Sequence, residues 1–182
     1  MLLIPGVVIA VLTFPGVIVH ELAHLMFCRL KRVPVYEAVY FTPDLKVQGY
    51  VLHGEIRELD TMLLVSCGPL IVNTLLCLLI CLPAALPAWF DDRSFASLFL
   101  LWLGVSVGMH AFPSHADAEA VWDLARREAK KGSLTAILSF PMVILIHIAN
   151  ILSVIWFDAL YGLFIGYFLP GRVLGWVYQL AR

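Results

Sequence analysis

Charged side chains are scarce in this sequence. Only 14% of the 182 residues are Asp, Glu, Lys or Arg, whereas 62% are hydrophobic and the mean hydropathy is +0.92. Four stretches contain no charged residue at all: 1–20, 61–90, 94–116 and 132–157. About 20 apolar residues suffice to cross the hydrocarbon core of a bilayer, and a soluble helix would show a polar stripe. The composition therefore argues against a soluble domain and predicts membrane-spanning helices.

Basic stripes and paired cysteines are also missing. With a net charge of −1 and no basic stretch interleaved with aromatics, nucleic-acid binding is disfavoured. Within apolar runs cysteine behaves as a small hydrophobe, so neither a disulfide framework nor a cysteine zinc site is expected. All four cysteines occur within or at the ends of such runs: Cys28, Cys67, Cys77 and Cys81. The N-terminal run lacks the basic segment and cleavage site of a signal peptide, so we expect it to be retained.

The uncharged runs predict an all-α polytopic membrane protein with about four to five transmembrane helices. We expect helices at about 2–30, 59–88, 94–112 and 134–157. Residues 158–182 could form a fifth span, continue the fourth helix or lie at the interface, because Pro170-Gly171-Arg172 interrupts them.

Two segments between the helices have a different character. Residues 33–58 are rich in Val and Tyr around Thr42-Pro43-Asp44, which predicts a small membrane-associated β-hairpin after the first helix. Residues 118–131 predict a short amphipathic helix whose apolar side faces the membrane interface.

Lys and Arg are distributed unequally among the loops. Residues 29–60 hold Arg29, Lys31, Arg32, Lys46 and Arg57, and residues 117–131 hold Arg126, Arg127, Lys130 and Lys131. The loop between the second and third helices holds Arg93 alone. The positive-inside rule then predicts a multi-pass protein with both basic loops in the cytoplasm and the N-terminus outside.

The first helix carries the sequence His20-Glu21-Leu22-Ala23-His24. This spacing puts two imidazoles on one helical face, where both can bind a single zinc ion, with the glutamate beside them as a general base. Ionisable residues inside a membrane helix are costly, so three of them in five positions call for a compensating partner such as a metal. We therefore expect Zn²⁺ at His20 and His24, with Glu21 as the catalytic residue.

A hydrolytic zinc site needs a third protein ligand and an open fourth position. Asp117, His110 and His115 all lie near the end of the third helix and are candidates for the third ligand. At 1.5 Å per residue, His20 and His24 would lie roughly 8–14 Å from the cytoplasmic end of the first helix. Asp117 can reach that depth if the chain turns at Pro113, and all three candidates remain open on the residues alone.

The second helix contains Gly68-Pro69 followed by Asn73. The glycine and proline would open the helical hydrogen-bond ladder, and Asn73 could donate to a substrate carbonyl or a developing oxyanion. The alternative is a simple kink with an asparagine hydrogen-bonded between helices.

These motifs together resemble the site-2 protease family, over about residues 5–125. The resemblance implies a three-helix core with zinc held by His20, His24 and Asp117, and a single metalloprotease domain over 1–182 whose C-terminal helices occupy 134–182. It also implies catalytic roles for Glu21 and Asn73, substrate binding by Gly68 and Pro69, and an edge strand that pairs with an extended substrate. Two features depart from the family: three residues rather than two separate Gly-Pro from Asn73, and Asp117 lacks the usual Leu-Asp-Gly context.

Two further histidines have alternative interpretations. His53 could line the substrate cleft from the hairpin or be a surface histidine. His147, with Asn150, is more typical of an interhelical hydrogen bond than of a metal ligand.

The expected function is intramembrane zinc proteolysis of a membrane protein or peptide substrate within the lipid bilayer, with the active site toward the cytoplasm. Two alternatives use the same motif: a non-catalytic membrane scaffold, and a metal-transporting membrane protein. The sequence indicates neither the substrate's identity nor the oligomeric state.

Overall fold

A computed structural model describes residues 5–44, 47–89 and 94–180 of the chain. The predicted helix start at residue 2 and the basic residues Lys46 and Arg93 lie outside these ranges. The described chain is mostly helical, with one small two-stranded antiparallel sheet. An all-helical protein with a hairpin after its first helix was predicted, and this coarse description is confirmed.

The N-terminal apolar run is not one helix. It forms α1 (Gly6–Leu12) and α2 (Phe14–Leu30), which meet at an angle of 88° around Thr13. Pro15 occupies the first turn of α2, where its missing N–H costs nothing, but it would break a helix that continued through it. The predicted single helix at 2–30 is therefore wrong, because the proline starts a new helix.

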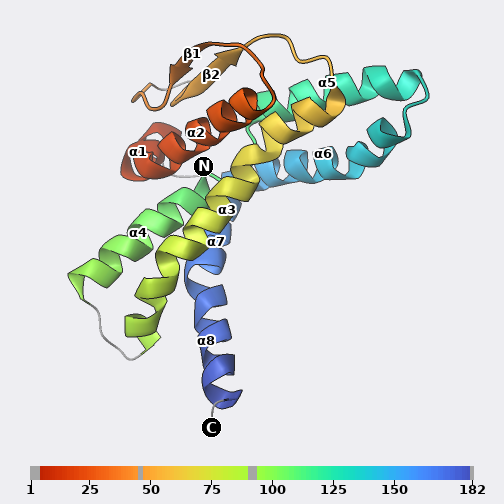
Figure 1. The fold of residues 1–182 in the computed structure, drawn as a ribbon. Helices are drawn as coiled ribbons and strands as arrows, with labels where there is room; N and C mark the ends of the chain where they lie inside the picture. The colour runs from red at the N-terminus through yellow and green to blue at the C-terminus, as the bar shows by residue number, and fades with distance from the viewer. Residues whose placement is uncertain (1–4, 45–46, 90–93, 181–182) are drawn as a thin grey trace.

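The hairpin follows α2 directly. Strand β1 (Val35–Val39) pairs antiparallel with β2 (Tyr50–His53), and Val39 lies opposite Tyr50. A register irregularity between Val35 and Glu37 bends β1. The hairpin lies over α2, on the same side of the molecule as α5 (Figure 1).

Helix α3 (Leu59–Trp89) runs through the length of the molecule (Figure 1). It packs at one end against α2 and α5 (His115–Lys130), and toward the other against α4 (Phe95–Met109). The first turns of α3 pack with α5 and α6 (Leu134–Leu152) in one hydrophobic core. Its buried residues are Leu59, Val121, Leu124, Ala125, Ala136 and Val143. The amphipathic α5 was predicted, but its apolar face packs on these helices rather than facing the membrane interface.

The C-terminal segment is helical throughout its described part. It consists of η1 (Ser153–Ile155), α7 (Phe157–Leu163), the π-helical turn η2 (Phe164–Phe168) and α8 (Leu169–Leu180). Small residues let α7 and η2 approach α3 and α4 closely. Gly104 on α4 leaves no room for a Cβ against Cys81 of α3, and a Cβ at Gly166 would lie 2.9 Å from the same sulfur.

Within the described ranges, two helical segments are long and apolar enough to cross a membrane, 59–84 and 134–155. A third is added if the bent pair of α1 and α2 counts as one span. The predicted four to five spans are not confirmed, because α4 has only 15 residues and the C-terminal segment is interrupted. The structure is thus consistent with an integral membrane protein.

Candidate metal centre

A cavity of about 710 Å³ lies where α2, β2, the end of α4 and the start of α5 meet. It is lined by residues far apart in the sequence, among them His20, Glu21, His24, His53, Asp117 and Asp158. Five of these six residues carry predicted roles, so the fold gathers most of the predicted chemistry in one place.

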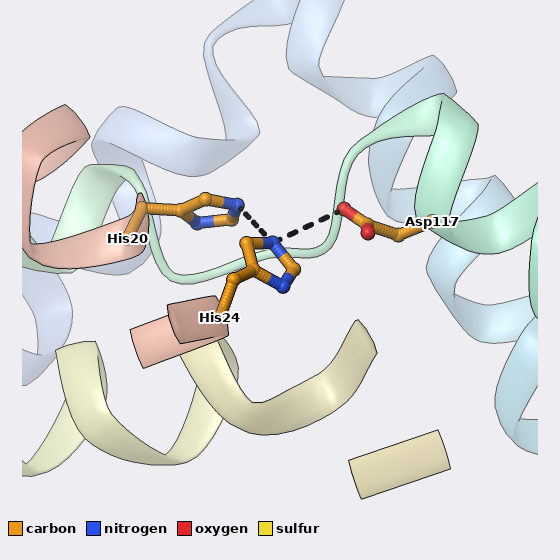
Figure 2. A group of neighbouring side chains, drawn as sticks. All are labelled: His20, His24 and Asp117. Atoms are coloured by element: carbon orange, nitrogen blue, oxygen red, sulfur yellow. Dashed lines mark hydrogen bonds and ion pairs between the residues drawn. The ribbon is translucent and has the colours of Figure 1, made fainter. Parts of the chain in front are cut away.

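The two histidines of α2 face each other across one helical turn. Their Nε2 atoms are 3.1 Å apart, and the rings meet edge to face (Figure 2). His24 is buried, as is Glu21 between the two histidines in the sequence. The spacing of four residues therefore does what the motif predicts: it aims both imidazoles at one point.

Each imidazole is fixed by its other nitrogen. Nδ1 of His20 donates to the carbonyl of His110 at 2.7 Å, and Nδ1 of His24 donates to the carbonyl of Val65 at 2.9 Å. A carbonyl oxygen only accepts, so in each ring the hydrogen is on Nδ1. In the neutral rings both Nε2 atoms consequently present lone pairs, and these lone pairs point at one another.

Asp117 adds a carboxylate to this pair. Its Oδ2 lies 3.5 Å from Nε2 of His24 (Figure 2), and one ligand atom from each of the three residues lies within 4.8 Å of the others. The carboxylate is held by Ser114, whose hydroxyl donates to Oδ2 at 2.6 Å and whose backbone N–H donates at 2.9 Å. Ser114 is the N-cap of α5, so the turn after Pro113 that was expected from the sequence delivers the aspartate at the helix start.

Asp117 is ionised in this environment. Burial would raise its pKa, but hydrogen bonding to His24 and Ser114 and the charge interaction with His24 outweigh burial and lower the pKa to about 2. The lowered pKa of Asp117 depends on a proton on Nε2 of His24, because an ionised carboxylate only accepts hydrogen bonds. Where that proton is absent, a metal ion would have to supply the positive charge between the carboxylate and the imidazoles.

Two of the three separations between the candidate ligand atoms fit a zinc ion, and all three are within 4.8 Å. With Zn–N bonds of about 2.0–2.1 Å and tetrahedral angles, two ligand nitrogens lie about 3.3 Å apart. The measured separations of 3.1 Å between the two Nε2 atoms and 3.5 Å from His24 to Asp117 bracket this value. Two imidazoles and one carboxylate also match the donor types of catalytic zinc sites, which leave the fourth position open. The residues present are thus suited to hold zinc.

The two other candidate ligands are not in this group. Thr13 donates its single hydroxyl hydrogen to the carbonyl of Ile9 at 2.7 Å, so Nε2 of His110, 2.8 Å away, must donate to the Thr13 oxygen. His110 therefore braces the bend between α1 and α2. His115 lines the cavity from the exposed start of α5, but within the described ranges the three-residue ligand group contains Asp117 instead.

Glu21 lies beside the two histidines, under the hairpin. A Cβ added to Gly49 would lie 2.8 Å from Cγ of Glu21 and 3.1 Å from its Oε1. The backbone at Gly49 therefore covers the carboxylate, and only glycine permits this approach. His53, predicted to bind substrate, also lines the cavity, and its Nδ1 donates to the carbonyl of Gly54 at 2.8 Å.

The Gly-Pro and asparagine of α3 lie outside the lining of the cavity. Gly68 packs on the ring of Phe27, where a Cβ would not fit, and Pro69 is fully buried. Asn73 is also fully buried, and its Nδ2 points at backbone carbonyls, including those of Val107 at 3.1 Å and His110 at 3.0 Å. This arrangement corresponds to the interhelical alternative for Asn73, and it leaves the amide hydrogens engaged with the backbone rather than aimed into the cavity.

Three cavity residues were not singled out for this role from the sequence. Gly49 precedes β2, Asp158 begins α7, and Asn150 on α6 donates to the carbonyl of Pro113 at 3.1 Å, which holds the turn before Asp117. Polar residues in apolar runs were the available signal for Asp158 and Asn150. Nothing in the sequence pattern distinguished Gly49 from other loop glycines.

Comparisons with protein-family models, with curated proteins and with solved structures found no match to this chain. The argument for function therefore depends on the geometry of the site.

Proposed function

We propose that this protein is an intramembrane zinc metalloprotease that hydrolyses peptide bonds in or near transmembrane segments of its substrates. One observation carries the proposal: a ring nitrogen from each of His20 and His24 and a carboxylate oxygen of Asp117 converge, with each imidazole fixed by a backbone carbonyl. Such a convergence of acceptors is unfavourable without a cation, and the spacing suits zinc.

His20, His24 and Asp117 would hold the metal, and Glu21 would move protons. Zinc bound there supplies a Lewis acid that polarises the scissile carbonyl and makes water more acidic. Glu21 takes a proton from the attacking water as the water oxygen bonds to the carbonyl carbon. When the carbon–nitrogen bond breaks, the same carboxyl group delivers that proton to the leaving amine, so that peptide and water give a carboxylic acid and an amine.

The hairpin supports a peptide as the substrate. Along the described chain β2 pairs only with β1, and residues of the β2 segment line the cavity, including Gly49, Val51 and His53. An extended segment of a membrane protein can pair with the free edge of β2 and so lie across the metal ligands. The excess of Lys and Arg in the hairpin and α5 segments supports a cytoplasmic location for this edge.

Replacing Glu21 with Gln tests the proposal. Glu21→Gln keeps the size of the side chain but removes the base, so we expect zinc content to be unchanged and cleavage of a transmembrane substrate in detergent to fall by at least about 100-fold. Glu119→Gln, the same substitution at an exposed position on α5, should cleave like the parent.

Other outcomes would favour another function. If Glu21→Gln cleaves at the parent rate, the chemistry proposed for Glu21 is wrong. A parent that binds zinc stoichiometrically but cleaves none of a panel of membrane substrates would indicate a scaffold. Zinc flux in proteoliposomes that is lost in His24→Ala but kept in Glu21→Gln would indicate transport.

A further inference from the structure

The imidazoles of His20 and His24 both bond to carbonyls that lack a helical partner: one is at the end of α4, and the other is four residues before a proline in α3. We propose that Pro69 and Asn73 of α3 are positioning residues that prepare these two carbonyls and so set the tautomer and direction of His24 and His20. The consequence for zinc affinity rests on the proposed function, whereas the consequence for the imidazoles does not.

Pro69 acts on His24. In an α-helix the N–H of each residue donates to the carbonyl four residues earlier, so residue 69 would donate to Val65. Proline has no N–H, and the carbonyl of Val65 is therefore left without its helical partner inside an apolar bundle. Nδ1 of His24 donates to this carbonyl at 2.9 Å and satisfies it.

Asn73 acts on His20. Helix α4 ends at Met109, and the last carbonyls of a helix have no partner within it. The carbonyl of His110, the C-cap residue, accepts from Nδ1 of His20 at 2.7 Å and from Nδ2 of Asn73 at 3.0 Å. These two donors match the two lone pairs of one carbonyl oxygen. Asn73 thereby ties the end of α4 to α3 at the height of the metal ligands.

The spacing of the two residues explains why one helix can serve both histidines. Pro69 and Asn73 are four residues apart, so they lie on the same face of α3, and both are fully buried. The three residues between Gly-Pro and Asn, which depart from the site-2 protease pattern, place the amide toward α2 and α4. The same amide also approaches the carbonyl of Gly16 on α2 at 3.4 Å.

These bonds matter because they decide what each imidazole offers. With the hydrogen held on Nδ1, Nε2 must present a lone pair, which is the form that binds a metal. If the carbonyl of Val65 were instead bonded within its helix, His24 could carry its hydrogen on Nε2 and turn it toward His20. The affinity for zinc would then fall, since the hydrogen would have to move from Nε2 to Nδ1 before Nε2 could bind the metal.

Pro69→Ala is the decisive variant. The alanine supplies an N–H that can reach Val65, and it removes a proline from a helix interior, so the variant should fold. Pro83→Ala makes the same change at an exposed site further along α3 and serves as the matched control. We expect nitrogen NMR of the metal-free Pro69→Ala protein to show His24 shifted from pure Nδ1–H toward a tautomer mixture, and chelator competition to show zinc affinity lowered about 10- to 100-fold.

Asn73→Leu tests the role of Asn73 in positioning His20. It removes the donor to His110 at similar volume, and we expect the Nδ1–H signal of His20 to lose its single tautomer and zinc affinity to fall about 10-fold or more. Thr74→Val, which removes a hydroxyl bonded to Tyr161 at 2.7 Å, is the control for a lost interhelical hydrogen bond away from the imidazoles. If Asn73→Leu does not fold, Asn73→Ser replaces it, because serine is small and polar but too short to bond the same carbonyls.

Two results would overturn the inference: tautomers in Pro69→Ala and in the Asn73 variant that match those of their controls, or zinc affinities that match. A parent protein that binds no zinc would instead remove the proposed function, while the tautomer measurement would still test the positioning roles. The two failures are therefore distinguishable.

Discussion

At the scale of single residues, Asp117 belongs both to the N-terminal cap of α5 and to the candidate metal site. Its Oδ2 accepts from the hydroxyl and the N–H of Ser114, which closes the capping box of α5, and it also lies 3.5 Å from His24. An aspartate at this third helical position stabilises the helix start, and the same bonds hold the carboxylate rigidly toward the histidines. Ser114 therefore orients the carboxylate of Asp117 as well as capping α5.

Asp117→Asn should separate the two roles. The amide can still accept from Ser114, so α5 should remain helical, but the negative charge that zinc requires is lost. We expect zinc affinity measured by chelator competition to fall by about 100-fold or more, beyond the effect of removing an outer partner. Asp123→Asn, at an exposed position on the same helix, should bind zinc like the parent. An affinity in Asp117→Asn equal to that of Asp123→Asn would remove Asp117 from the ligand set.

Gly49 offers a test of how the hairpin covers Glu21. In Gly49→Ala the new Cβ would lie 2.8 Å from Cγ of Glu21, so either the carboxylate or the hairpin must shift. We expect the cleavage rate to fall about 10- to 100-fold with zinc content unchanged, because small displacements of a catalytic group are costly. The control is Gly54→Ala, whose Cβ would lie 2.7 Å from Pro34 at the base of the same hairpin and away from Glu21. Equal losses in the two variants would mean that only the hairpin's folding is affected.

At the scale of elements, α3 connects the two ends of the molecule. Near the candidate metal ligands it packs Gly68 against the ring of Phe27 on α2, and further along it packs Cys77 and Cys81 against glycines of α4 and η2. Close approach through small residues is a general way for helices to associate in membranes, because apolar side chains that leave the lipid gain no hydrophobic free energy there. The position of α2, and with it both histidines, therefore depends on the small size of residue 68.

Gly68→Ala should destabilise the protein through this contact. A methyl group at residue 68 overlaps the Phe27 ring, and overpacking of this kind costs about 1–3 kcal/mol. Thermal unfolding in detergent should show a lower midpoint, and the double variant Gly68→Ala, Phe27→Leu should recover part of the loss. Gly171→Ala, where a Cβ meets nothing within 4 Å, should leave the midpoint nearly unchanged. If the double variant unfolds at the same midpoint as Gly68→Ala, the lost stability does not come from the contact with Phe27.

The sequence predicted the helices and the hairpin better than the bends and contacts between them. The boundaries of α3 and the order of helix, hairpin and helices follow from uncharged runs, and the His-Glu-x-x-His spacing places two imidazoles together on any straight helix. The 88° bend at Thr13 was missed because a proline in an apolar run permits either a kink or a new helix. The sequence allowed an interhelical bond for Asn73 and an opened ladder at Pro69, but it could not identify the carbonyls of Val65 and His110 as the acceptors, since that depends on which groups come within reach in three dimensions.

At the scale of the whole molecule, the polar and charged elements gather at one end. The hairpin, α2 and α5 lie toward the start of α3, while the end of α3 and the start of α4 lie at the other end (Figure 1). Because the segments rich in Lys and Arg are at the first end, the positive-inside rule predicts that this end lies in the cytoplasm, as proposed above.

Site-specific labelling tests this orientation. We expect a cysteine introduced by Lys130→Cys, at the exposed end of α5, to react with a membrane-impermeant maleimide only from the cytoplasmic side. Ser94→Cys, at the exposed start of α4, should react only from the opposite side, and the unmodified chain provides the background. Labelling of both positions from one side would mean that α3 does not cross the membrane in the proposed way.

The close packing of α3 against α4 and η2 also makes two native cysteines sensitive to the separation of these helices. The sulfurs of Cys77 and Cys81 are completely buried, and each is in contact with a glycine of another helix, so no alkyl group can be added to either while the helices remain together. The rate at which a small, bilayer-permeant alkylating agent modifies these two thiols should therefore equal the rate at which the bundle separates. Mass spectrometry of the unaltered protein could follow that separation with no attached probe.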